Sequence, residues 1–163
     1  MNERIWRALR NALDDLSEEE INWRPLPQAN SINVIVRHLR IEAEWHLDSL
    51  ERGAPMPTVV TSPSQEAIDA VPLDFVENFK QLENFYTRFL EILRTSTLAS
   101  VKQQTAAAYG QAAESEGRRY LLAYHQATHV AMHCGQIRMI RNLYRKTRGE
   151  PARFFPENPT YPN

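Results

Sequence analysis

Hydrophobic residues recur three and four positions apart along most of the chain, which is the period of an amphipathic α-helix. This pattern predicts four helices, over roughly residues 2–17, 31–52, 73–96 and 116–147. The third helix has the most regular seam, which consists of Phe75, Phe79, Leu82, Tyr86, Phe89 and Leu93. Such a seam is typical of a helix that packs in a bundle. The sequence contains no alternating strand pattern of useful length and no internal repeat.

Prolines, glycines and capping residues separate the predicted helices. The connector at 21–30 contains two prolines, and Asn30 or Ser31 can cap the second helix. Residues 53–72 contain four of the ten prolines and show no sustained period, so we expect a long connection there. The last helix is expected to end near Gly149.

Four amphipathic helices in a chain of 163 residues with 42% hydrophobic content predict an all-α four-helix bundle. We expect one domain over residues 1–163 with an extended tail at 151–163. Proline and aromatic residues in this tail favour a cap on its own bundle over a cover for a pocket or a second subunit. Residues 97–113 fit either a loop or a weak helix. The long connection between the second and third helices leaves the topology open.

Composition narrows the classes of partner. A net charge of −1 provides no strong field for nucleic acid or an anionic membrane, and no segment approaches a membrane span in apolar length. The single cysteine, Cys134, is an expected core residue and excludes an internal disulfide. The N-terminus lacks the pattern of a secretory signal, so we expect a cytoplasmic protein. The last helix carries Arg138, Arg141, Arg145 and Arg148, interpreted as a solvated stripe rather than an anion site.

Histidines are confined to two of the predicted helices. They are His38 and His46 on the second helix and His125, His129 and His133 on the fourth. Spacings of four and eight place each set on one helix face, with Glu42 between the two on the second helix. The fourth-helix column continues an apolar face and is expected to point inward. A single histidine on such a face is usually a hydrogen-bonded core residue, but five in two columns favour a metal site.

The rise of the helix limits which histidines can share an ion. Positions eight apart lie about 12 Å apart along the axis, whereas zinc binds imidazole nitrogen at about 2.0–2.1 Å. One ion therefore takes two residues from the fourth helix, His125 with His129 or His129 with His133, and either His38 or His46 from the second. His129 belongs to both pairs and is the strongest candidate.

Other site classes lack their motifs. A di-iron carboxylate bundle needs Glu-x-x-His on two helices, and no histidine of this chain has a glutamate three residues before it. The sequence also lacks the GxSxG, GxxxxGK[ST] and GxGxxG patterns of serine hydrolases and nucleotide-binding loops.

Three segments resemble the DinB-like superfamily of four-helix-bundle metalloenzymes, in a branch of mostly unassigned function. The signature HxxxHxGQ of that superfamily's last helix is similar to THVAMHCGQI at residues 128–137. The start and end of its second helix are similar to NSINVIVRHL at residues 30–39, and the tail of this branch resembles ENPTYP at residues 157–162. The first and third helices match only in pattern.

This resemblance implies a metal site made by His38, His129 and His133, with zinc or nickel as the common ion. His46 and His125 match no ligand position, which leaves them as candidates for lining a pocket or supporting the ligands, with plain structural roles as the alternative. Some relatives are transferases or isomerases that depend on a low-molecular-weight thiol, and a homodimer is also implied. The expected partners are thus a small-molecule substrate, such a thiol and a second copy of the chain.

Three protein ligands leave a coordination position open for water, a thiolate or a substrate oxygen, as in catalytic zinc sites. We therefore expect a metal-dependent enzyme, a thiol-dependent transferase or a hydrolase; the alternative is a non-catalytic metal-binding or stress-response bundle. Gln136, one turn after His133, can orient a ligand. Glu42 can accept an imidazole N–H or act as a general base, or can instead pair with Arg37 or Arg40.

Overall fold

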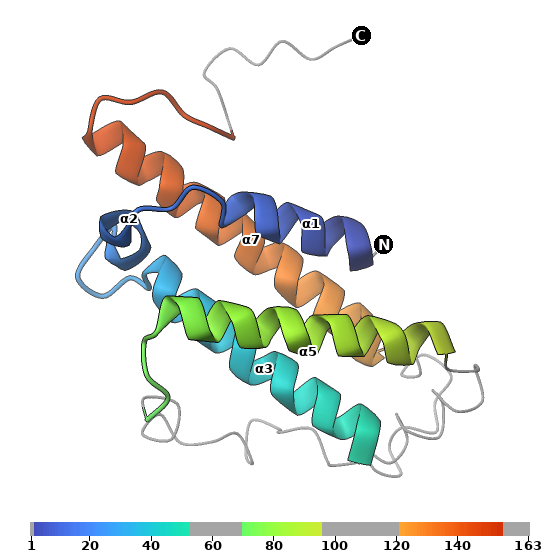
Figure 1. Cartoon of the computed structure of the whole chain (residues 1–163). Helices are drawn as coiled ribbons and strands as arrows, with labels where there is room; N and C mark the ends of the chain where they lie inside the picture. Colours follow the sequence, from blue (N-terminus) through green and yellow to red (C-terminus); the bar gives the residue numbers. More distant parts are fainter. Residues whose placement is uncertain (1, 53–69, 96–120, 155–163) are drawn as a thin grey trace, which may run out of the picture.

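The computed structural model describes residues 2–52, 70–95 and 121–154, and these residues contain helices and no strand. The helices are α1 (Asn2–Ala12), α2 (Glu18–Asn22), α3 (Ile32–Arg52), α5 (Phe75–Thr95) and α7 (Leu121–Thr147). The closest packing is of α3 with α5 and of α1 with α7, while α3 and α7 also touch (Figure 1). The prediction of an all-α four-helix bundle is confirmed.

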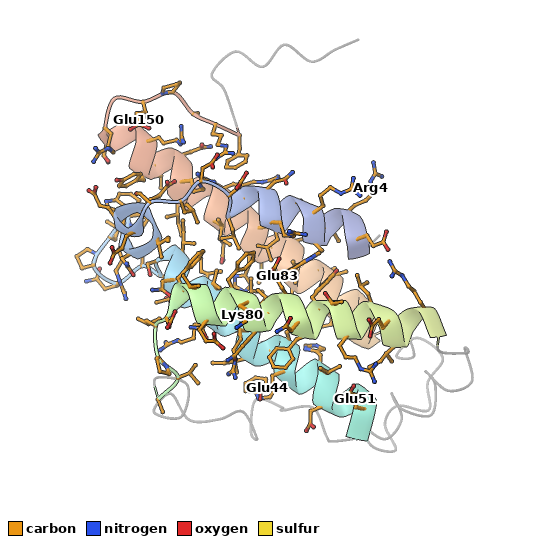
Figure 2. All side chains as sticks on the ribbon, viewed as in Figure 1. Arg4, Glu44, Glu51, Lys80, Glu83 and Glu150 are labelled. Atoms are coloured by element: carbon orange, nitrogen blue, oxygen red, sulfur yellow. The ribbon has the colours of Figure 1, made fainter. Side chains whose placement is uncertain are left out.

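Apolar side chains from all four long helices fill the space between the ribbons (Figure 2). The seam predicted for the third helix is buried at Leu82, Tyr86 and Phe89. Trp6 of α1 stacks on Tyr86 of α5, with ring centroids 4.4 Å apart. Complete burial of a large apolar side chain contributes about 1.5–3 kcal/mol to the free energy of folding. The buried residues of this seam therefore account for much of the packing around α5.

Helix boundaries agree with the capping residues in the sequence. Ser31 Oγ accepts a hydrogen bond from the backbone N–H of Val34 at 3.4 Å, at the start of α3. At the end of α7, Gly149 adopts a φ of 71°, and Glu150 N–H donates to Arg145 C=O at 2.9 Å. This pairing is the Schellman arrangement, in which a glycine in the left-handed region ends a helix. Each of these two predicted boundaries is confirmed.

Other predicted segments fall partly or wholly outside the described residues. The second and third helices lie within two residues of their expected bounds, and the fourth is described from Leu121 onward. Residues 53–69 of the long connection, the ambiguous stretch 97–113 and residues 155–163 of the tail lie outside the described parts. Among the helices that the structure describes, none has the length and hydrophobicity needed to cross a membrane.

The first helix is shorter than predicted. An uninterrupted helix over 2–17 is wrong, because α1 ends at Ala12, Asp15 has a φ of 55°, and α2 begins after Ser17. Arg141 Nη1 from α7 donates to the backbone carbonyls of Ala12 at 2.9 Å and Asp14 at 2.8 Å. These carbonyls thus find a donor outside their own helix, and Ser17 Oγ caps α2 by accepting from Glu20 N–H at 3.1 Å.

Arg141 also corrects the interpretation of the arginine stripe. Its side chain is fully buried and donates through Nε to Glu20 Oε1 at 2.8 Å. The ring of Phe154 lies over its guanidinium, 5.6 Å from centroid to Cζ. A solvated stripe is therefore wrong at Arg141, where the charge is paired inside the bundle, although Arg148 at the helix end is exposed.

Candidate metal centre

Three imidazoles from two helices converge at the contact between α3 and α7. His38 Nε2 lies 3.1 Å from His129 Nε2, and His133 Nε2 lies 2.9 Å from the same atom. All three ligand atoms lie within 4.8 Å of one another. Of the combinations that helical spacing permits, the fold brings together the set that the resemblance implies.

The convergence suits a shared cation better than a hydrogen-bonded cluster. Each ring nitrogen of a neutral imidazole carries either a proton or a lone pair, so His129 Nε2 can make one good hydrogen bond but not two. By contrast, tetrahedral zinc with Zn–N bonds of about 2.0–2.1 Å places its ligand nitrogens about 3.3 Å apart. Separations of 2.9 and 3.1 Å are close to that value. The donor set therefore fits a divalent metal.

Gln136 fixes the ring of one of these histidines. Its Oε1 lies 2.7 Å from His133 Nδ1 and, as an amide oxygen, accepts the N–H of that nitrogen. With the proton on Nδ1, the Nε2 of His133 presents its lone pair to the other two imidazoles.

Glu42 lies between two histidines of α7. Its Oε2 is 3.3 Å from His129 Nδ1 and 3.6 Å from His125 Nε2. Among the described groups, neither Oε2 nor His129 Nδ1 completes a hydrogen bond, so a small rotation of the carboxylate is enough to form one between them. The alternative pairing of Glu42 with Arg40 is not favoured, because Arg40 binds Glu44 at 3.1 Å.

Burial keeps these imidazoles neutral. Desolvation, assisted by the neighbouring His133, lowers the pKa of His38 to about 4. Desolvation and then the charges of the surrounding histidines lower the pKa of His129 to about 3. The pKa of His133 is also lowered by burial, against the opposing hydrogen bond to Gln136. A metal requires deprotonated ligands, and at neutral pH these three residues already meet that requirement.

A family model matches residues 3–146, and its description is mycothiol-S-transferase. The chain belongs to this family. Because the family is part of the DinB-like superfamily, the resemblance read from the sequence is confirmed. Searches of curated proteins and of solved structures gave no significant match.

This mycothiol-S-transferase family member places its two other histidines beside Glu42. His46 is fully buried, whereas 47% of the His125 side chain is exposed. Their rings stack with centroids 5.3 Å apart. The ring of His46 therefore lies in the interior of the bundle. Cys134 is buried as expected, and burial raises the pKa of its thiol.

Two surface hollows in the described part of this family member have no histidine in their walls. One of about 560 Å³ lies beside α1 and α5, with Trp6 and Phe79 in its wall. Another of about 490 Å³ is lined by Trp45 and Phe85. Neither hollow has a histidine in its lining. The group of His38, His129 and His133, unlike the hollows, has a recognisable chemistry, that of a metal-binding site.

One buried polar residue near the histidines was not predicted. Gln126 is 2% exposed, and its Oε1 has no hydrogen-bond partner among the described residues. The signal in the sequence is a glutamine placed three residues before His129 and next to His125 on a largely apolar helix. A buried acceptor without a partner costs about 1–3 kcal/mol, so the Oε1 of Gln126 is a candidate for a further polar contact.

Proposed function

We propose that this protein is a metal-dependent S-transferase. His38, His129 and His133 hold one divalent cation, zinc or nickel, and the protein transfers a low-molecular-weight thiol, through its sulfur, to a small electrophile. The observation that carries the proposal is the convergence of three neutral imidazole nitrogens in a member of a family named for mycothiol S-transfer. Mycothiol is accordingly the first thiol to test.

A divalent cation with an open coordination position supplies a place where a thiol is held as its thiolate. The protein ligands of the cation determine how strongly the negative charge of the thiolate is stabilised. Three neutral imidazoles leave the cation's double positive charge undiminished, whereas thiolate ligands would cancel it. Gln136 keeps His133 in the metal-binding tautomer through the contact at 2.7 Å, and Glu42 is placed to do the same for His129.

The proposed transfer is a displacement at carbon. The thiol loses its S–H proton, its sulfur forms a C–S bond with the electrophilic carbon, and the leaving group departs with the electrons of the broken bond. The released proton balances the charge of the leaving group. No oxidant or reductant takes part.

The first test compares metal content and turnover in protein prepared without a polyhistidine tag. Zinc and nickel are measured by elemental analysis in wild type and in His38→Ala, His129→Ala and His133→Ala. A chromogenic aryl halide is then offered with mycothiol, cysteine or glutathione. Met139→Ala is the matched control, because Met139 lies on the same helix as two of the ligands and is 63% exposed.

We expect each histidine variant to lose one cation equivalent together with thiol-dependent turnover, and Met139→Ala to keep both. Stoichiometric binding of neither metal, or full turnover in all three histidine variants, overturns the proposal. Metal binding without turnover for any thiol would instead support the non-catalytic bundle, and thiol-independent ester cleavage would support the hydrolase. The homodimer stays a prediction, to be tested by sedimentation.

A further inference from the structure

A second group of donor atoms lies on the other side of the His129 ring. Glu42, His46 and His125 each place one ligand atom within 4.8 Å of the other two. Glu42 and His46 come from successive turns of α3, and His125 comes from α7, one turn before His129. The group thus bridges the same two helices as the three-histidine site but shares no ligand with it.

His46 has an acceptor atom that the described protein groups leave unsatisfied. Its Nδ1 lies 2.6 Å from the backbone carbonyl oxygen of Glu42, so Nδ1 carries the proton and donates it. The lone pair is then on Nε2, which is buried and has no partner among the described groups. An unsatisfied buried acceptor costs about 1–3 kcal/mol, and the ring itself is 0% exposed. A ligand that accepts this lone pair would remove the cost.

The neighbouring groups indicate the charge of that ligand. Glu42 Oε2, which lies 3.6 Å from His125 Nε2, has no hydrogen-bond partner among the described groups. A carboxylate oxygen and the lone pair of a neutral imidazole are both electron donors, and a divalent cation accepts both at once. The exposed ring of His125 provides a route from solvent.

We propose that Glu42, His46 and His125 form a second binding site for a divalent cation. Two imidazoles and one carboxylate are the protein ligands of several zinc hydrolases, and they leave a fourth position open. Zinc is the fitting probe because it accepts nitrogen and oxygen ligands together. The site requires neither occupation of the three-histidine site nor the transferase activity proposed above.

The two sites are adjacent but separate. His129 directs Nε2 to the first site, while its Nδ1 lies 3.3 Å from Glu42 Oε2. The His129 ring and the Glu42 carboxylate therefore lie between the two cations, unlike paired catalytic metals, which lie about 3.5–4 Å apart. A Glu42 carboxylate that binds a cation is a weaker acceptor for the His129 N–H, and the two cations repel each other. The second equivalent therefore binds more weakly than it does when the first site is empty.

The experiment counts zinc equivalents in chelator-stripped protein prepared without a polyhistidine tag, by calorimetric titration and by equilibrium dialysis with elemental analysis. The decisive variant is His125→Ala, because 47% of the His125 side chain is exposed and its removal leaves the core intact. Circular dichroism checks that this variant folds. Glu42→Gln tests the carboxylate. Glu44→Gln is its matched control, because Glu44 lies on the same helix with 47% of its side chain exposed.

We expect two equivalents in wild type and in Glu44→Gln, and one in His125→Ala and Glu42→Gln. Loss of a direct ligand should weaken the second equivalent by more than about 100-fold, since even outer contacts contribute 10–100-fold. His38→Ala should keep the second equivalent and bind it more tightly than wild type does. A single equivalent that His38→Ala abolishes and His125→Ala retains would refute this site while leaving the proposed function intact. Two equivalents in both His125→Ala and Glu42→Gln would refute it as well.

Discussion

Replacement of Arg141 by methionine should destabilise the fold more than any surface change on α7. The guanidinium is fully buried, and it donates to Glu20 Oε1 at 2.8 Å and to the carbonyls of Ala12 and Asp14 at 2.9 and 2.8 Å. Arg141→Met leaves the Glu20 carboxylate, itself 4% exposed, without its counter-charge. Removal of one partner from a buried pair costs about 3–5 kcal/mol, a large share of the 5–15 kcal/mol that stabilises a typical domain.

The prediction is measured by urea unfolding of the metal-free protein at pH 7, followed by far-ultraviolet circular dichroism. The Glu20→Leu and Arg141→Met double variant should be more stable than Arg141→Met alone, because it contains no uncompensated buried charge. Arg10→Met is the surface control. Its ion pair with Glu83 spans 3.3 Å but joins side chains that are 59% and 36% exposed, and such pairs contribute about 0.2–1 kcal/mol.

Two results would refute this reasoning. One is a cost for Arg141→Met no larger than that for Arg10→Met, which would mean that the pair adds nothing beyond an exposed ion pair. The other is a double variant as unstable as the sum of the Glu20→Leu and Arg141→Met effects, because additivity would mean that the two groups do not interact.

Three further predictions concern the site and the helix ends. Gln136→Leu should weaken zinc binding by about 10–100-fold in a calorimetric titration, because His133 loses the acceptor that fixes its tautomer; unchanged affinity would contradict that role. The metal-free protein should lose stability as pH falls from 6.5 towards 4, because the pKa of His46 is about 4 when folded and 6.5 when unfolded, so the unfolded chain takes up the proton first. In urea unfolding, His46→Gln should reduce the slope of unfolding free energy against pH by up to about 1 kcal/mol per pH unit. An unchanged slope would exclude His46 as the source of this pH dependence. Gly149→Ala should destabilise the fold by about 1–2 kcal/mol, because the φ of 71° is unfavourable for alanine. Gly135→Ala should stabilise it by up to about 1 kcal/mol, because Gly135 lies within a helix and no atom crowds the new Cβ. Thermal unfolding that shifts in the same direction for both variants would contradict this prediction.

Periodicity and capping residues were sufficient to predict the four long helices, apart from the end of α1, and most of the residues that they bury. They could not choose among the histidine combinations, because spacing within one helix says nothing about its axial offset from another. The resemblance selected His38, His129 and His133, and packing of α3 against α7 then places His38 and His133 at Nε2 of His129 and Glu42 near its Nδ1. The grouping of Glu42 with His46 and His125 depends on the axial offset between α3 and α7 alone.

The early end of α1 and the burial of Arg141, both contrary to prediction, have one cause. Leu13 and Leu16 continue the apolar period of α1, so local pattern alone extends that helix beyond Ala12. The group that ends it, Arg141, lies 129 residues later in the chain than Ala12. An arginine on a helix that carries several other arginines is usually solvated. Only the buried partner of Arg141, Glu20, distinguishes Arg141 from the other arginines of α7.

A cation bound by the proposed ligands would also make the lifetime of the protein depend on metal supply. His38 belongs to the helix that packs along α5, while His129 and His133 belong to the helix that packs along α1. A cation bound by all three fastens one half of the bundle to the other, and at a free concentration 100 times its dissociation constant it adds about 2.7 kcal/mol to the folding free energy. Chelation removes that contribution and raises the unfolded fraction about 100-fold. Metal starvation would therefore make the apoprotein more susceptible to proteolysis as well as inactive.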